Sequence, residues 1–183
     1  MLSFPAVEQL RPTANRIRET LFNWLQEEVP FEDCLDLFAG SGACGLEALS
    51  RGARQVVFVE QNRLVADAIV TNLSLLGEPG MQVIRNDAVA WLKNQAHQES
   101  QKFGIVFIDP PYAAQLEREC CHLLEDSDLL KDRAFIYLES NRDLQENLFP
   151  AGWRMIKKKR AGAVFFVLLE RLADGAGKTD EQQ

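Results

Sequence analysis

The chain lacks a long apolar run, and its amino-terminal segment lacks the charged and then apolar pattern of an export signal. A membrane-spanning helix needs about 18 or more consecutive apolar residues, and no such stretch occurs. We therefore expect neither a membrane span nor export, and we expect the protein to be cytoplasmic.

Paired metal-ligating residues are also missing. The four cysteines, Cys34, Cys44, Cys120 and Cys121, form no Cys-x-x-Cys pair, and the two histidines lie far from them in sequence. Structural zinc sites usually draw their ligands from such pairs. The sequence therefore predicts no metal site, and we expect the cysteines to be reduced thiols in the core of a cytosolic protein.

An excess of positive charge is lacking as well. The formal net charge is −7 and the sequence pI is about 4.9, which excludes a protein that coats nucleic acid through bulk electrostatics. Contact with RNA must then be local. Two polar and basic stretches are candidates for it: Arg11, Thr13, Arg16 and Arg18 near the start, and Lys157, Lys158, Lys159 and Arg160. A charge run is equally typical of a solvated surface, so both interpretations stay open.

Length and hydrophobic content allow one substantial core. With 183 residues, of which 46% are hydrophobic, the chain is too short for two independent cores. We expect an amino-terminal helical arm over residues 1–29 and a single folded domain over residues 30–171. The small, polar segment 172–183 is expected to be a disordered tail.

Apolar periodicity predicts alternating strands and helices after a first amphipathic helix that includes Ile17 and Leu25. The expected strands cover residues 34–38, 55–60, 81–86, 103–112 and 134–140, and the expected helices cover 45–52, 63–77, 88–96 and 114–125. Two last strands, at 153–159 and 163–170, should form an antiparallel hairpin. This order predicts an α/β fold: a doubly wound, mostly parallel seven-stranded sheet with a C-terminal antiparallel hairpin.

A glycine-rich turn follows the first expected strand and opens a helix. It reads Asp36-Leu37-Phe38-Ala39-Gly40-Ser41-Gly42-Ala43-Cys44-Gly45. Glycines let the backbone approach a ligand closely, and a helix N-terminus offers unpaired N–H groups. Gly40, Gly42 and Gly45 also match the GxGxxG pattern of NAD-binding proteins, with Glu60 placed to bind ribose hydroxyls. The turn alone leaves NAD and S-adenosylmethionine both open.

Two further features favour the methyl donor S-adenosylmethionine. Asp36 lies in the strand end just before the glycines, and Asn86-Asp87-Ala88 closes the third strand, where an adenine amine could be bound. Asp87 could instead serve only as the N-cap of the following helix. Because ligands bind at the carboxyl ends of strands in open sheets, the candidate cofactor-binding residues are Asp36, Phe38, Ala39, Gly40, Ser41, Gly42, Gly45, Glu60, Gln61, Asn86, Asp87 and Ala88.

The motif Asp109-Pro110-Pro111-Tyr112 ends the fourth strand and supplies the candidate catalytic residues Asp109, Pro110 and Tyr112. An exocyclic amine is a poor nucleophile because its lone pair is delocalised into the ring. Asp109 and the Pro110 carbonyl can accept hydrogen bonds from such an amine, and Tyr112 offers a face for stacking a flipped base. A simple Pro-Pro strand terminator is the alternative. The motif predicts an amine-directed methyltransferase.

With these motifs in this order, the chain resembles the bacterial family of small-subunit ribosomal RNA guanine-N2 methyltransferases known by the letter D. The matching stretches are RPTANRIRETLFNWL (11–25), LDLFAGSGACGLEALSRGA (35–53), Glu60, NLSLLG (72–77), Asn86-Asp87-Ala88 and FIDPPY (107–112). The family usually has additional residues before the first stretch, including a basic strand pair, whereas ten residues without positive charge precede Arg11 here.

The resemblance implies a Rossmann-like class I methyltransferase that uses S-adenosylmethionine. Its substrate would be one guanine N2 in 16S ribosomal RNA, within the small subunit or its assembly intermediates, and we expect a monomer. A DNA adenine-N6 methyltransferase shares the DPPY motif but generally carries a separate sequence-reading region. A protein-glutamine methyltransferase typically has Asn in place of Asp109. A non-catalytic assembly factor would have no need of Asp36, Glu60, Asp87 and Asp109 together, and an NAD oxidoreductase would lack a nearby proton donor.

Overall fold

The computed structural model describes residues 12–78, 81–95 and 101–172. The strands are β1 (Asp33–Asp36), β2 (Gln55–Val59), β3 (Gln82–Ile84), β4 (Phe103–Ile108), β5 (Leu130–Ser140), β6 (Trp153–Ala161) and β7 (Val164–Arg171). The α-helices are α1 (Pro12–Trp24), α2 (Ala43–Ser50), α3 (Arg63–Leu76), α4 (Ala88–Gln95) and α5 (Glu117–Asp126), with 3₁₀ helices η1 (Tyr112–Ala114) and η2 (Glu146–Leu148). Arg11 and the tail from residue 173 onward lie outside the described residues.

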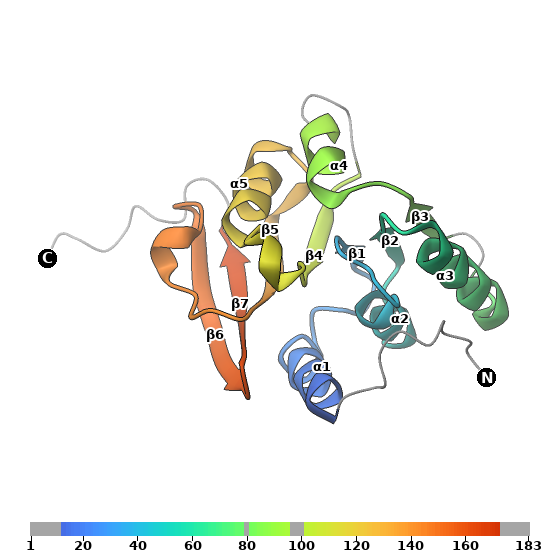
Figure 1. The fold of residues 1–183 in the computed structure, drawn as a ribbon, viewed down its shortest axis with the longest axis horizontal. Coiled ribbons are helices and arrows are strands. Elements are labelled where there is room, and N and C mark those ends of the chain that lie inside the picture. Colours follow the sequence, from blue (N-terminus) through green and yellow to red (C-terminus); the bar gives the residue numbers. More distant parts are fainter. Residues whose placement is uncertain (1–11, 79–80, 96–100, 173–183) are drawn as a thin grey trace, which may run out of the picture.

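The strands form one seven-stranded sheet in the order β3-β2-β1-β4-β5-β7-β6 (Figure 1). The five strands from β3 to β5 run parallel, whereas β7 pairs antiparallel with both β5 and β6. The chain leaves β1 toward β2 and β3, and later continues on the other side with β4 and β5. The doubly wound sheet with its C-terminal hairpin is thus confirmed, and its switch point lies between β1 and β4.

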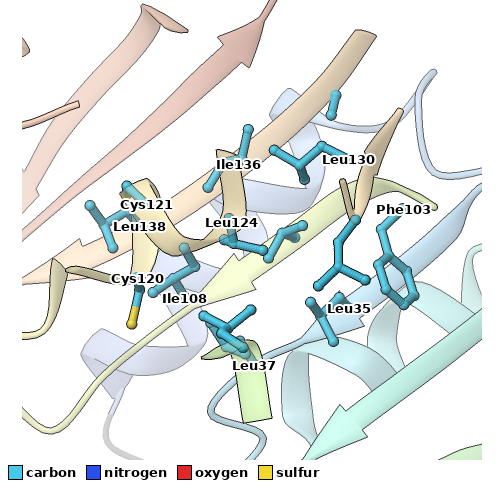
Figure 2. Packing of buried hydrophobic residues seen from close by; sticks show 14 of the residues in the cluster. Leu35, Leu37, Phe103, Ile108, Cys120, Cys121, Leu124, Leu130, Ile136 and Leu138 are labelled. Carbon is cyan, nitrogen blue, oxygen red and sulfur yellow. The ribbon is translucent and has the colours of Figure 1, made fainter. Parts of the chain in front are cut away.

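Successive side chains of each strand enter opposite faces of the sheet, where helices cover both of them. On one face, Leu35, Ile108 and Ile136 pack with α4 and α5. Figure 2 shows these three residues beside Leu124 of α5. On the other face, Cys34, Phe107 and the neighbouring strand residues pack with α1, α2 and α3. Figure 1 shows these two helical layers on either side of the sheet. Strands buried on both faces explain the near-continuous apolar runs of the sequence.

The first helix belongs to the core. Leu21, Phe22 and Leu25 have no exposed surface, and the Phe22 ring lies 5.7 Å from the ring of Phe107 in β4. On the neighbouring turn, the ring of Trp24 stacks on Phe166 of β7 at 5.4 Å. The segment expected as an arm is therefore packed against the same sheet face as α2 and α3.

Several elements differ from the sequence-based expectation. β4 ends at Ile108 rather than at residue 112, and β3 covers Gln82–Ile84 rather than residues 81–86. β5 begins at Leu130 rather than at residue 134, because Leu130 pairs with Phe103 across an irregularity in the ladder. Polar residues at 131–133 separate Leu130 from the apolar run that begins at residue 134, so the sequence does not reveal this pairing. In the segment after the Pro-Pro corner, the expected helix starts as the short η1 and continues as α5 from Glu117. In the described part of the chain, no helix is long and apolar enough to cross a membrane.

Candidate active site

A cavity of about 420 Å³ opens at the carboxyl edge of the parallel strands. Its walls come from the ends of β1, β2 and β4, the turns that follow them, and the turn after β3. The lining residues are Asp36, Leu37, Phe38, Ala39, Gly40, Ser41, Ala43, Cys44, Val59, Glu60, Gln61, Asn86, Asp87, Ala88, Asp109, Pro110, Pro111 and Tyr112. This volume is in the range of sites for small ligands and cofactors. The switch point of the sheet therefore carries a ligand-sized hollow.

The glycine-rich turn forms the floor of this cavity. Gly40 and Gly42 both have positive φ angles, of 51° and 77°, which side chains rarely adopt. A Cβ on Gly40 would meet one neighbour, the Phe38 carbonyl oxygen, at 3.9 Å, so the space above it is open. The Gly42 N–H donates to the Ala39 carbonyl oxygen at 2.6 Å and tightens the turn. The backbone at Gly40 is thus free to be approached by a ligand.

Gly42 and Gly45, both predicted to bind the cofactor, are absent from the cavity lining. Gly42 is the left-handed N-cap of α2. A Cβ on Gly45 would lie 2.2 Å from Cε1 of Phe58, so this glycine lets α2 pack closely on β2. In these positions the two glycines shape the turn instead of facing the ligand space.

Asp36 ties the end of β1 to the start of α2. Its side chain is buried, and its Oδ2 accepts a hydrogen bond from the Gly45 N–H at 2.9 Å. Burial raises the pKa of Asp36 to about 7, and repulsion from Glu60 adds to the rise, although the Gly45 N–H opposes it. A carboxylate beneath the turn therefore titrates near neutral pH.

Glu60 follows β2 and braces the same turn from the other side. Its Oε2 accepts from the Gly40 N–H at 2.8 Å, and its Oε1 accepts from the Asn62 N–H at 2.7 Å. A carboxylate has about four lone-pair positions, so these two bonds leave capacity for ligand hydroxyls. Glu60, which was predicted to bind ribose hydroxyls, thus holds the turn in place and keeps lone pairs for a ligand.

Asp87 is the N-cap of α4 and also lines the cavity, so the cap does not exclude the predicted ligand contact. Its Oδ1 accepts from the Ala90 N–H at 2.9 Å, which is the N-cap bond of α4, and the residue also lines the cavity. Asn86 supports it, since its Oδ1 accepts from the Asp87 N–H at 2.9 Å. The cap fixes the carboxylate at the cavity edge.

The corner from Asp109 to Tyr112 follows β4, on one side of β1, whereas Glu60 and Asp87 follow β2 and β3 on the other side. All four of its residues line the cavity, and Tyr112 keeps 37% of its surface exposed. Pro111 was not predicted as a site residue, although it belongs to the motif. The cavity therefore joins the candidate cofactor turn and the candidate amine-binding corner.

Cys44 departs from the expectation that all cysteines are core thiols. Cys34, Cys120 and Cys121 are buried, whereas Cys44 is half-buried and lines the cavity. Burial, followed by the charges of Asp36, Glu139 and Asp109, raises the pKa of the Cys44 thiol well above its ordinary value. Its place in the glycine-rich turn was the one sequence signal for this position.

The basic stretches divide between faces of the molecule. On α1, Arg16 is exposed and Arg18 is half-exposed, and the Arg18 charge partly opposes the rise that burial causes in the pKa of the Cys44 thiol. In β6, Lys157 and Lys159 pair with Leu168 and Phe166, whose side chains lie on the α1 face, so they share this face. Lys159 lies 5.8 Å over the ring of Trp24.

The other two cations of the run point away from α1. The Lys158 ammonium pairs with Asp143 at 2.6 Å and donates to the Leu144 carbonyl at 2.7 Å, while the guanidinium of Arg160 lies 4.9 Å over Phe165. Thr13, also predicted to contact RNA, lies in α1.

Among the residues that the structure describes, no group of three or more His, Cys, Asp or Glu is arranged to hold a metal ion.

Similarity to known proteins agrees with this architecture. Residues 1–170 match the family model described as conserved hypothetical protein 95. The chain is 41% identical over 179 residues to ribosomal RNA small subunit methyltransferase D of Escherichia coli strain K12, covering 98% of this chain and 88% of that protein.

Solved structures show the same fold. The protein yhhF of Escherichia coli, described as a candidate methyltransferase, superposes with a TM-score of 0.81 at 42% identity, covering 91% of this chain and 90% of the other. The protein SMU.776, solved in complex with SAH, has a TM-score of 0.71 at 12% identity and covers 88% of this chain and 50% of the other, which shows the fold alone. The fold is that of the Rossmann-like class I methyltransferases, and the chain belongs to the ribosomal RNA small subunit methyltransferase D family.

Proposed function

We propose that the protein transfers a methyl group from S-adenosylmethionine to the exocyclic N2 amine of a guanine in 16S ribosomal RNA. The observation that carries this proposal is that the Asp109–Tyr112 corner lines the same cavity as the glycine-rich turn, Glu60 and Asp87. An acceptor for an amine and a site for a nucleoside-sized ligand thus share one space. The relative named as a ribosomal RNA small subunit methyltransferase supports the choice of RNA.

The lining residues fit S-adenosylmethionine. Glu60 has lone pairs left for ribose hydroxyls, and Asp87 at the edge of β3 can accept from an adenine amine. The open backbone at Gly40 suits the close approach of a charged amino-acid moiety. Leu37, Val59 and Ala88 add apolar surface for the base.

The chain's residues would then direct the chemistry. When bound, S-adenosylmethionine supplies an electrophilic methyl carbon attached to sulfur. Asp109 and the Pro110 carbonyl accept hydrogen bonds from the guanine amine and turn its nitrogen lone pair toward that carbon, while Tyr112 stacks on the base. The cofactor would supply the methyl group and keep the electron pair of the bond that it loses, while Asp109 would take up the proton released by the amine and pass it to water.

The test combines the purified protein, isotope-labelled S-adenosylmethionine and small ribosomal subunits whose 16S RNA lacks the modification. Nucleosides from the digested RNA are separated and identified by mass. We expect labelled N2-methylguanosine at one position. Labelled N6-methyladenosine, in this RNA or in plasmid DNA added in parallel, would contradict the proposal and favour the DNA methyltransferase alternative. Binding to subunits without any label transfer would favour a non-catalytic assembly factor.

The expected partner is 16S ribosomal RNA in the small subunit or in one of its assembly intermediates, met in the cytoplasm by a monomer. Running the same assay on naked 16S RNA, on assembly intermediates and on complete subunits ranks the three as substrates. Sedimentation of the protein alone over a hundredfold concentration range measures whether it stays monomeric.

A further inference from the structure

Glu139 lies at the end of β5, on the strand next to the Asp109–Tyr112 corner. Phe107 of β4 pairs in parallel register with Tyr137 of β5, and both side chains lie in the core on the α1 face. Two residues further along the chain come Asp109, the first residue after β4, and Glu139, near the end of β5. Glu139 pairs with Phe166 of β7, whose side chain lies on the α1 face, so Glu139 lies on this face beside the strand end that Asp109 follows.

The surroundings of Glu139 agree with this placement. Its Oε1 accepts a hydrogen bond from the Tyr137 hydroxyl at 2.6 Å, whereas no described residue donates to its Oε2. After burial as the largest cause, Glu139 and Asp109 both raise the pKa of the Cys44 thiol and of the Tyr137 hydroxyl. Glu139 is not itself among the cavity-lining residues, but its charge acts on the thiol of Cys44, which is.

The strand order places Glu139 on the same side of β1 as Asp109. Glu60 and Asp87 follow β2 and β3 on one side of β1, whereas Asp109 follows β4 and Glu139 follows β5 on the other. A cofactor held by Glu60 and Asp87 would leave the side of β4 and β5, where Asp109 and Glu139 lie, for the substrate base. A base whose amine is held by Asp109 would therefore have its adjacent edge near the strand end that carries Glu139.

We propose that Glu139 is a specificity-determining residue that accepts a hydrogen bond from the N1–H of the target base, beside the amine held by Asp109. This inference rests on the proposed function. Guanine offers two adjacent donors on its Watson–Crick edge, the N2 amine and N1–H, and two adjacent carboxylates match them. Adenine offers an amine beside an N1 acceptor, which would face a carboxylate oxygen without a proton between them. A buried acceptor left unpaired in this way rejects the wrong base.

A purely structural function for Glu139, namely anchoring the Tyr137 hydroxyl, makes a different prediction. Loss of that anchor would slow methylation of every base by the same factor. The two functions are distinguished by a base that keeps the 2-amine and lacks N1–H. 2-Aminopurine has this property, because its N1 is an acceptor.

The experiment places either guanine or 2-aminopurine at the mapped target position by ligating a synthetic segment into 16S RNA and reconstituting the subunit. Single-turnover methylation of both substrates is measured for the wild type, Glu139→Gln, Glu139→Asp and the control Glu146→Gln. Glu146 is an exposed carboxylate in η2, so its substitution makes the same chemical change away from the site. Titration calorimetry with S-adenosylmethionine checks that each variant is folded.

We expect the wild type and Glu146→Gln to prefer guanine by about 100-fold or more. In Glu139→Gln the amide can donate to N1 of 2-aminopurine, so the preference should fall by at least about tenfold, with cofactor affinity unchanged. Glu139→Asp should be slower and still prefer guanine, because the carboxylate remains. An unchanged preference in Glu139→Gln, with both rates lowered equally, would overturn the inference while leaving the proposed function intact. Failure of the wild type to methylate guanine would instead refute the proposed function.

Discussion

At the level of single residues, Asp109 is the group whose removal should separate chemistry from cofactor binding. Asp109→Ala removes the acceptor that orients the amine, while the glycine-rich turn, Glu60 and Asp87 remain. Loss of one well-placed polar partner costs about 3 kcal/mol, or roughly a hundredfold in rate. Tyr112→Ala should cost about 1 to 3 kcal/mol of stacking and weaken capture of the base.

Single-turnover kinetics on small subunits and titration calorimetry with S-adenosylmethionine measure the two effects separately. Cofactor affinity should stay within a few-fold of the wild type in both variants. Full methyl transfer by Asp109→Ala, or complete loss of its cofactor binding, would show that this corner does not hold the amine.

Asp36 makes stability depend on pH in a direction unusual for a carboxylate. Its pKa is about 7 in the folded protein, and an unfolded aspartate titrates near 3.9. Between these values the folded state holds a proton that the unfolded state has released, so this residue lowers the free energy of unfolding as pH rises from about 4 to 7. Asp36→Asn keeps an oxygen acceptor for the Gly45 N–H and removes the ionisation.

The difference in the free energy of unfolding between Asp36→Asn and the wild type should therefore shift in favour of the variant from pH 5 to pH 8. At 1.36 kcal/mol per pKa unit, we expect this shift to be about 1 to 4 kcal/mol. Urea unfolding at both pH values measures this. Asp126→Asn, at an exposed carboxylate in α5, is the control and should show no such pH-dependent gain. A difference between Asp36→Asn and wild type that is the same at pH 5 and pH 8 would mean that Asp36 titrates normally.

At the level of elements, the contact between α2 and β2 sets the position of the glycine-rich turn. Helix propensity alone predicts that Gly45→Ala stabilises α2 by about 1 kcal/mol. The structure predicts the opposite, because the new Cβ would lie 2.2 Å from Cε1 of Phe58, a ring with no exposed surface. Overpacking of this kind costs about 1 to 3 kcal/mol, and displacing α2 would also move the Gly45 N–H away from Asp36.

Gly152 offers a matched control, because a Cβ there would meet nothing within 4 Å. Chemical unfolding should show Gly45→Ala to be clearly less stable than the wild type and Gly152→Ala to be close to it. Cofactor affinity should fall in Gly45→Ala as well. Equal stability of the two variants would mean that α2 can shift on β2 at no cost.

Sequence periodicity was sufficient for the order and type of the main elements, because strands buried on both faces and one-sided helices leave different apolar patterns. Boundaries were less accessible where tertiary pairing decides them. The start of β5 at Leu130 depends on its pairing with Phe103, and residues 131–133 between this pair and the apolar run are polar. The motifs indicated Asp36, Glu60, Asp87 and Asp109 because each follows a strand, and ligands on open sheets gather there.

What the sequence could not give was adjacency across strands. Glu139 lies near the end of an apolar strand without a motif, and only the parallel register of β4 and β5, which pairs Ile108 with Leu138, indicates that it lies close to Asp109. Cys44 could be assigned to the cavity only once the turn was built, because a half-buried thiol and a core thiol look alike in sequence. The four cations at 157–160 likewise look like one basic patch in the sequence. In the strand, alternate side chains point to opposite faces, so the four cations divide into two pairs.

For the whole molecule, a net charge of −7 should repel RNA, which is itself a polyanion. Binding therefore requires cations that are gathered on one face. Lys157 and Lys159 lie on the face of the sheet that α1 covers, and Arg16 and Arg18 belong to α1. Glu139 lies on this face too, because it pairs with Phe166. Lys158 is already paired with Asp143, and Arg160 packs over Phe165 on the other side. RNA should therefore be held along the α1 face.

The double variant Lys157→Ala/Lys159→Ala should bind small-subunit RNA more weakly, and the slope of log affinity against log salt should become shallower by about 1 to 2, since each phosphate contact to single strands contributes about 0.7. Lys158→Ala/Arg160→Ala removes the same net charge from the opposite side, so it serves as the control and should change the slope by less than half as much. Equal slopes for the two double variants would mean that the cations act through net charge alone, because only a localised RNA-binding face can distinguish one side of β6 from the other.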